Sequence, residues 1–404
     1  MCNSLLVHPL SIQGFDHQRW NFSGKRTTVE YITRQPDRFK CAVCDSHKVT
    51  ATAVKEREIK AGAIGGDNWI LKVKMHRVRC HECNAYCMEH LDFLSKPSSR
   101  VTKSLERSIL ELRRDMSISA LAKHFNLDWR TVKEIEKSSL AKKYKSVSLK
   151  GVKVIGIDEV YVGKRRFKTI VRDMTSGAVL HVGDGKGGDA LEVFGNKLKH
   201  SKTNIETVAM DMARGYVSWV EKNLPDAVIV FDHFHIIKLM NEKVDKVRRR
   251  IVNNLEKEAA AGLKKKRFLL LKNEENLDQE EWAEREIVNN QYHEVGCAVI
   301  SKEKLRNVYK FARDEVEAEW LLFNWCEEAD KSEIKELKSM AKCIRAHIVG
   351  ILAYWSTDGI NSAAVEGFNN KIGWLQRQAF GYRDQEYFRL KIFDLPNIKI
   401  QKEL

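Results

Sequence analysis

The sequence predicts an α/β protein in which a mixed sheet carries an all-α insertion and follows a small basic module. Short β-branched runs alternate with helical patterns from about residue 151 onward, and the pattern from about 240 to 350 is entirely helical. Residues 1–150 hold 28 Lys+Arg against 16 Asp+Glu, whereas the other 254 residues hold 42 against 39. This asymmetry indicates a basic module joined to a nearly neutral body.

The composition limits the protein class. With 43% hydrophobic residues and only 5 prolines in 404 residues, the chain can bury a core and is not disordered. No apolar run reaches the roughly 18 residues of a membrane span, and the N-terminus lacks the pattern of a secretory signal. We expect a soluble, cytoplasmic protein without a membrane partner. Its basic third favours nucleic acid as partner, and a merely solubilising surface is the alternative.

Two Cys-x-x-Cys pairs stand in the basic third, Cys41 with Cys44 and Cys80 with Cys83. Two such pairs supply the four thiolates of a closed structural zinc site. A redox-active pair is the alternative interpretation.

The gap between the pairs is longer than in common zinc fingers. Residues 69–75 alternate as a half-buried strand should, and residues 50–59 are a suitable partner, which predicts a zinc ribbon with an extended hairpin. Three nearby residues are candidate substitute ligands: His81, Cys87 and His90. The predicted N-terminal domain spans residues 1–95.

A helix-turn-helix pattern follows within residues 96–145. Residues 118–125 place four apolar side chains on one helical face, Asn126 can form the tight turn, and Asp128 is a good N-cap for a second helix. A preceding helix fits residues 100–114. The outward residues at the start of the second helix are Trp129, Arg130 and Lys133, where base edges would be read. An ordinary helical hairpin is the alternative.

The third predicted domain spans residues 150–404. Its expected strands cover residues 152–158, 167–171, 178–182, 205–211 and 227–232; its expected helices cover residues 189–198 and 216–223 and begin again near 235. The order β-β-β-α-β-α-β-α is that of a ribonuclease-H-like domain. The helical insertion would follow at about 240–350, with Trp282, Trp320 and Trp325 as packing anchors.

Three of these strands place an aspartate at the end of the apolar run, namely Asp158, Asp211 and Asp232. Any one of them could simply cap a loop. Adjacent strands of an α/β sheet, however, deliver their C-terminal residues to a shared crevice, where the carboxylates repel one another unless divalent cations bind. Two Mg²⁺ ions suit such a site and phosphoryl chemistry. Glu366, on a helix-like stretch, is available as a further carboxylate, although one glutamate on a helix is a weak signal.

The chain resembles the ISL-three family of bacterial insertion-sequence transposases, with a DDE-type catalytic domain. The matching segments are Gly156-Ile-Asp-Glu159, Val208-Ala-Met-Asp-Met212, residues 229–238 (IVFDHFHIIK) and residues 361–382 (NSAAVEGFNNKIGWLQRQAFGY). The resemblance implies a catalytic triad of Asp158, Asp211 and Glu366 holding two Mg²⁺ ions, with Mn²⁺ as a substitute. It also implies a D-x-x-H signature in which His235 contacts the scissile strand. A core histidine at a strand end is the alternative for His235.

The resemblance implies a DNA transposase that binds the terminal inverted repeats of its element, cleaves there, and joins the ends to target DNA as a multimer. The zinc ribbon and the helix-turn-helix would recognise the ends. Two alternatives differ in class: a domesticated DNA-binding regulator without catalysis, and a ribonuclease-H-like nuclease without strand transfer. The intact set of three acidic residues disfavours the first, and the N-terminal DNA-reading module disfavours the second.

Overall fold

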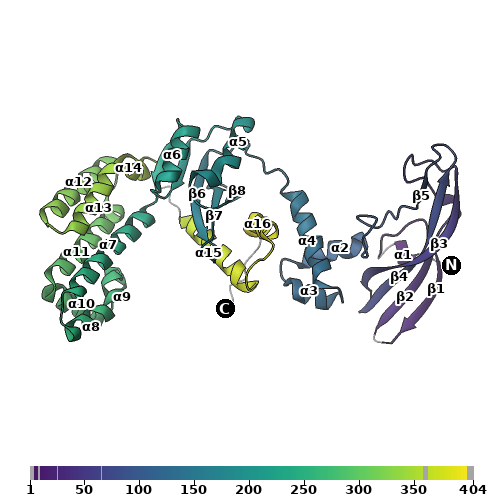
Figure 1. Ribbon diagram of the computed structural model, residues 1–404, viewed down its shortest axis with the longest axis horizontal. Coiled ribbons are helices and arrows are strands. Elements are labelled where there is room, and N and C mark those ends of the chain that lie inside the picture. Colours follow the sequence, from purple (N-terminus) through teal and green to yellow (C-terminus); the bar gives the residue numbers. More distant parts are fainter. Residues whose placement is uncertain (1–3, 8–9, 25, 65, 358–362, 398–404) are drawn as a thin grey trace. The chain divides into compact units, whose positions relative to one another are not determined.

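A computed structural model describes residues 4–7, 10–24, 26–64, 66–357 and 363–397, apart from the side chains at positions 4, 5, 363–366 and 397 (Figure 1). The described chain forms two compact units, which divide between Lys145 and Ser146. No helix in the described residues is long and apolar enough to cross a membrane.

A five-stranded sheet forms the N-terminal part of the first unit. After the short helix α1 (Ser4–Val7), its strands are β1 (Phe15–Ser23), β2 (Thr27–Arg34), β3 (Val49–Ile64), β4 (Asp67–Cys80) and β5 (Tyr86–Met88). The predicted hairpin is confirmed: β3 and β4 are antiparallel, with Ile59 opposite Leu71. Alternate side chains of β4 are buried in the core, as the sequence pattern requires.

Strands β1 and β2, which the sequence patterns did not predict, complete this sheet. Strand β2 runs parallel to β4, and β1 pairs with β2 on the outer side. The N-terminal region is therefore larger than a zinc ribbon with a hairpin.

The helix-turn-helix of the same unit is confirmed as three helices, α2 (Lys103–Leu112), α3 (Ile118–His124) and α4 (Trp129–Lys143). Asn126 has a φ of 50°, the left-handed conformation that asparagine tolerates in a tight turn. Asp128 caps α4 by accepting a hydrogen bond from the amide of Arg130 at 2.8 Å.

The second unit contains a mixed sheet with the order β10-β9-β6-β7-β8. Its strands are β6 (Val154–Tyr161), β7 (Phe167–Asp173), β8 (Val179–Asp184), β9 (Thr207–Met210) and β10 (Val228–Phe231). The first three are antiparallel neighbours, and β9 and β10 run parallel to β6. Helices α5 (Glu192–Ser201) and α6 (Arg214–Asn223) connect the later strands, which confirms the ribonuclease-H-like order.

The predicted insertion is helical and forms a bundle within this unit (Figure 1). Its helices are α7 (His233–Asn253), α8 (Lys257–Lys265), α9 (Arg267–Leu271), α10 (Gln279–Gln291), α11 (His293–Phe311), α12 (Glu315–Lys331), α13 (Lys335–Ala346) and α14 (Ile348–Ser356). The prediction of three tryptophan anchors is partly wrong. Trp325 is buried, but Trp282 and Trp320 are exposed because they lie on the outer faces of their helices.

The chain returns to the sheet after the bundle. Helix α14 packs on β10, and Gly350 lies so close to Phe231 that a larger side chain would collide with the ring. Helices α15 (Ala363–Gln378) and α16 (Gln385–Asp394) then pack against β6 and β8.

Candidate functional site

Three aspartates form one row across the parallel strands of the second unit. Ile157 of β6 pairs with Met210 of β9, and Met210 pairs in turn with Phe231 of β10. The next residue on each strand is Asp158, Asp211 or Asp232, so that the three follow in register.

The strand ends differ from the prediction in one respect. Asp211 and Asp232 directly follow their strands, but β6 continues beyond Asp158 to Tyr161. The reason is that the other edge of β6 pairs with β7 as far as Tyr161, after β9 has ended.

The surroundings of the Asp158 side chain disfavour its charged form. Its side chain is buried, and this burial raises the pKa to about 6, with the charges of Asp211 and Asp232 acting in the same direction. Two contacts oppose the rise: the charge of His235, and the amide of Glu159, which donates to Oδ1 at 2.7 Å.

His235 lies between two of these aspartates. Its Nδ1 is 3.2 Å from Oδ2 of Asp232, and its Nε2 is 4.0 Å from Oδ1 of Asp158. Burial lowers the pKa of His235, but the hydrogen bond to Asp232 and the nearby carboxylates outweigh it and raise the pKa overall. Asp232 in turn caps α7 by accepting from the amide of Phe234. The structure therefore places His235 within contact distance of Asp232 and Asp158.

Helix α15 brings a residue that the sequence reasoning missed. Asn369 donates from Nδ2 to Oδ2 of Asp158 at 2.6 Å. Glu366 stands three positions earlier on α15, one helical turn away and on the same face; its side chain lies outside the described residues. The signal that could have found Asn369 is this i, i+3 spacing to a candidate carboxylate.

The donor set beside the row fits a divalent cation. It consists of carboxylate oxygens, and beside them lies the buried side-chain carbonyl Oδ1 of Asn369, which has no hydrogen-bond partner among the described residues. Among the described side chains, the aspartates alone do not approach closely enough to enclose an ion. A complete site needs a further ligand, and α15 is the element that can bring one.

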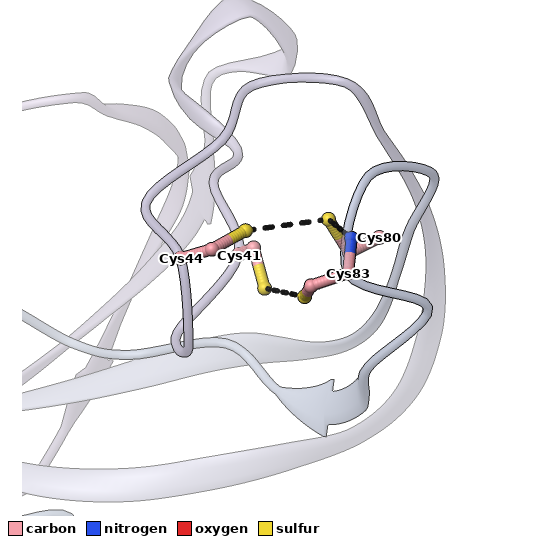
Figure 2. Close-up of side chains that lie close together, drawn as sticks. All are labelled: Cys41, Cys44, Cys80 and Cys83. Carbon is pink, nitrogen blue, oxygen red and sulfur yellow. Dashed lines mark hydrogen bonds between the residues drawn. The ribbon is translucent and has the colours of Figure 1, made fainter.

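The four cysteines of the first unit do converge (Figure 2). Their sulfur atoms all lie within 4.8 Å of one another, with 3.6 Å from Cys41 to Cys83 and from Cys44 to Cys80. Zn–S bonds of about 2.3 Å in a tetrahedron need sulfurs roughly 3.8 Å apart. The four cysteines could therefore hold a zinc ion.

Backbone amides donate hydrogen bonds to two of these thiols. The amide of Val43 donates to Cys41 and the amide of Glu82 donates to Cys80, both at 3.4 Å. Backbone hydrogen bonds lower the pKa of Cys41 to about 6 and lower that of Cys80 as well, whereas contacts among the thiols and burial raise the pKa of the other two cysteines. His81 instead contacts Thr50 at 2.7 Å, and none of the three substitute ligands belongs to the cluster.

The predicted DNA-reading residues begin helix α4. Trp129 is half exposed, and the guanidinium of Arg130 lies 5.3 Å from the centre of its ring. The side chain of Arg130 is 76% exposed, and Lys133 follows one turn later. An exposed cation beside an exposed aromatic ring at a helix N-terminus suits contact with nucleic acid.

A family profile described as "Transposase" matches residues 155–392, more than half of the chain. The chain belongs to the ISL3 family of transposases. A second profile, "Helix-turn-helix domain of transposase family ISL3", matches residues 89–138. The protein is thus a DNA transposase with a helix-turn-helix DNA-binding domain.

Named relatives agree with this assignment. The transposase is 28% identical over 389 residues to the transposase for insertion sequence element IS1001 of Bordetella parapertussis, which covers 94% of each chain. It is 27% identical over 296 residues to the transposase for IS1557 of Mycobacterium tuberculosis, covering 67% of this chain and 66% of that one. Among solved structures, the Drosophila P element transposase strand transfer complex matches with a TM-score of 0.39 and 11% identity, covering 73% of this chain and 92% of that one.

Proposed function

We propose that this transposase cleaves and joins DNA through a divalent-cation site built from Asp158, Asp211 and Glu366. One observation carries the proposal. The hydrogen bond from Asn369 to Asp158 anchors α15 at the aspartate row, and Glu366 lies on the same face of that helix one turn away.

Each residue has a separate role in this proposal. Asp158 and Asp211 present carboxylate oxygens from neighbouring strands, and Glu366 supplies the third from α15. Two Mg²⁺ ions, or Mn²⁺ in their place, would activate the attacking oxygen and stabilise the leaving oxygen of an in-line displacement. His235, held by Asp232, presents Nε2 beside Asp158 and donates to the scissile strand.

The same site would serve two reactions. Water would attack the phosphodiester at the element's end and displace a 3′-OH. That 3′-OH would then attack a phosphodiester of the target DNA and displace the target strand's own 3′-oxygen as a new 3′-OH. No covalent bond between protein and DNA forms in either step.

The first unit would recognise the terminal inverted repeats. Zn²⁺ held by the cysteine cluster would fix the end of the sheet, and α4 would read bases through Trp129, Arg130 and Lys133. Because transposition joins two ends to one target, we propose a multimer on DNA.

The test substitutes glutamine for Glu366, which keeps the shape and removes the charge. Cleavage and strand transfer in Mg²⁺ should both fall by at least about a thousandfold, equivalent to about 4 kcal/mol of transition-state stabilisation, while binding of repeat-end DNA persists. Cleavage by Glu366→Gln at the wild-type rate would refute the triad and make Asp232 the next candidate ligand. Wild-type protein that binds the ends but never cuts them would favour the domesticated regulator.

The control variant needs a glutamate without a structural role. Glu336, on α13 of the insertion, is unsuitable because it is buried and forms a 3.1 Å ion pair with Arg250. Its substitution would leave the partly buried guanidinium of Arg250 with one acidic partner fewer. The exposed Glu319 on α12 is the better control, and Glu319→Gln should cleave normally.

A further inference from the structure

One polar atom beside the aspartate row lacks a hydrogen-bond partner. The Oδ1 of Asn369 is buried and has no partner among the described residues, although Nδ2 of the same amide donates to Asp158 at 2.6 Å. A buried acceptor that lacks a donor lowers the stability of the fold. Packing alone therefore does not explain why a carbonyl occupies this position.

The orientation of the amide follows from its neighbour. Reversing the amide would set Oδ1 against a carboxylate oxygen of Asp158, with two acceptors facing each other. Asp158 thus holds the nitrogen, and Oδ1 is left beside the same carboxylate with free lone pairs. The structure supplies an acceptor next to the proposed site and, among the described residues, no donor for it.

Helix α15 has other anchors on the sheet. Gln376 donates to the carbonyl of Val162 at 3.2 Å, and the buried ring of Phe368 lies 4.2 Å below the guanidinium of Arg172. The helix therefore does not depend on Asn369 alone for its position.

We infer that Asn369 is a positioning residue of the divalent-cation site, in which Nδ2 fixes Asp158 and Oδ1 accepts a hydrogen bond from water that the cation holds. This inference rests on the proposed function. Mg²⁺ usually keeps several of its waters when it binds carboxylates, and such waters are donors that require acceptors. Groups that hydrogen-bond to metal ligands orient those ligands and raise metal affinity.

The first experiment measures Mn²⁺ binding to the full chain by calorimetry. Asn369→Ala removes both amide contacts, and the neighbouring Asn370→Ala is the matched control because Asn370 is exposed on the same helix. We expect Asn369→Ala to weaken Mn²⁺ binding about 10- to 100-fold and Asn370→Ala to leave it unchanged. Equal affinities of wild type and Asn369→Ala would overturn the inference.

A second variant separates positioning from a purely structural role. Asn369→Asp keeps an acceptor but sets a second carboxylate against Asp158, so that the two charges repel until a cation binds. Its melting temperature should be lower than wild type without Mn²⁺, and it should rise more on addition of Mn²⁺. A melting temperature lowered equally with and without Mn²⁺ would indicate packing only and would count against the inference.

Asp158→Asn locates the bound ion. If this variant binds Mn²⁺ as well as wild type does, the ion is elsewhere, and both the proposed catalytic site and the inference are wrong. If Asp158→Asn loses Mn²⁺ and Asn369→Ala retains it, the proposed function stands and the inference alone fails.

Discussion

The cysteine cluster and the aspartate row are both candidate metal sites, and they are built in opposite ways. The four cysteines come from two short turns at one end of a single sheet, and their sulfurs already stand at tetrahedral spacing. The aspartates come from three strands, and their partner Asn369 is 211 residues away from Asp158 along the chain. Among the described side chains, the first group is closed and the second is open.

The closed and the open arrangement suit different functions. A closed thiolate site has no free position for a substrate and serves to stabilise the fold. An open carboxylate site keeps positions for water and phosphate oxygens, and it retains charge repulsion that a cation relieves. We therefore expect loss of metal to unfold the first site and to inactivate the second without unfolding it.

Removal of zinc should have the largest effect on stability. Cys80→Ser replaces a buried ligand and should abolish zinc binding and unfold the first unit, because structural zinc contributes about 10–16 kcal/mol in small peptides. Metal analysis under reducing conditions, with circular dichroism, measures both effects. Cys87→Ser is the control, since Cys87 is outside the cluster, and should keep one zinc per chain. A wild-type chain that binds no zinc would show that the cysteine cluster is not a structural zinc site.

The aspartate row should give the next largest effect, which is a dependence of the free energy of unfolding on pH. The pKa of Asp158 is raised from 3.8 to about 6, so the folded protein binds a proton that the unfolded chain releases between these values. Stability without added divalent cation should thus fall as pH rises through this window, by up to about 3 kcal/mol at 1.36 kcal/mol per unit.

Urea unfolding of wild type and Asp158→Asn should be measured from about pH 4 to about pH 7, which spans this window. The difference between their free energies of unfolding isolates the contribution of Asp158. The variant should lose the dependence, and Mg²⁺ should suppress it in wild type by favouring the carboxylate. An identical pH dependence in both proteins would mean that the pKa of Asp158 is not raised in the folded protein.

Substitutions on α4 should weaken DNA recognition without affecting either metal site. Arg130→Ala or Lys133→Ala should cost about 1–3 kcal/mol in binding the terminal repeat and relax specificity at one base position. Lys142→Ala, at the exposed far end of α4, should weaken binding equally for all sequences or not at all. Fluorescence anisotropy with repeats altered one base at a time measures affinity and specificity. If both Arg130→Ala and Lys133→Ala leave affinity and specificity unchanged, α4 does not read bases.

Local patterns predicted much of the fold because they report short-range physics. The alternation around Leu71 predicted a hairpin, and Asp128 predicted the start of α4, since a cap and a strand period depend on near neighbours. Strand β1 was missed because it is mostly exposed, and β2 was missed because its buried positions are mostly polar, namely Thr28, Glu30 and Arg34. The exposure of Trp320 was also missed, since helical spacing does not tell which face of α12 the other helices cover.

By itself, the sequence determined the two cysteine pairs, the order of strands and helices in the second unit, and the positions of three aspartates that follow apolar runs. These features depend on residue type and spacing along the chain. Only the tertiary structure decided that Asp158 lies within a strand, that His235 lies between two aspartates, and that Asn369 joins them from α15. The physical reason is that these contacts depend on strand register and on helices returning from far along the chain, which a linear pattern does not encode.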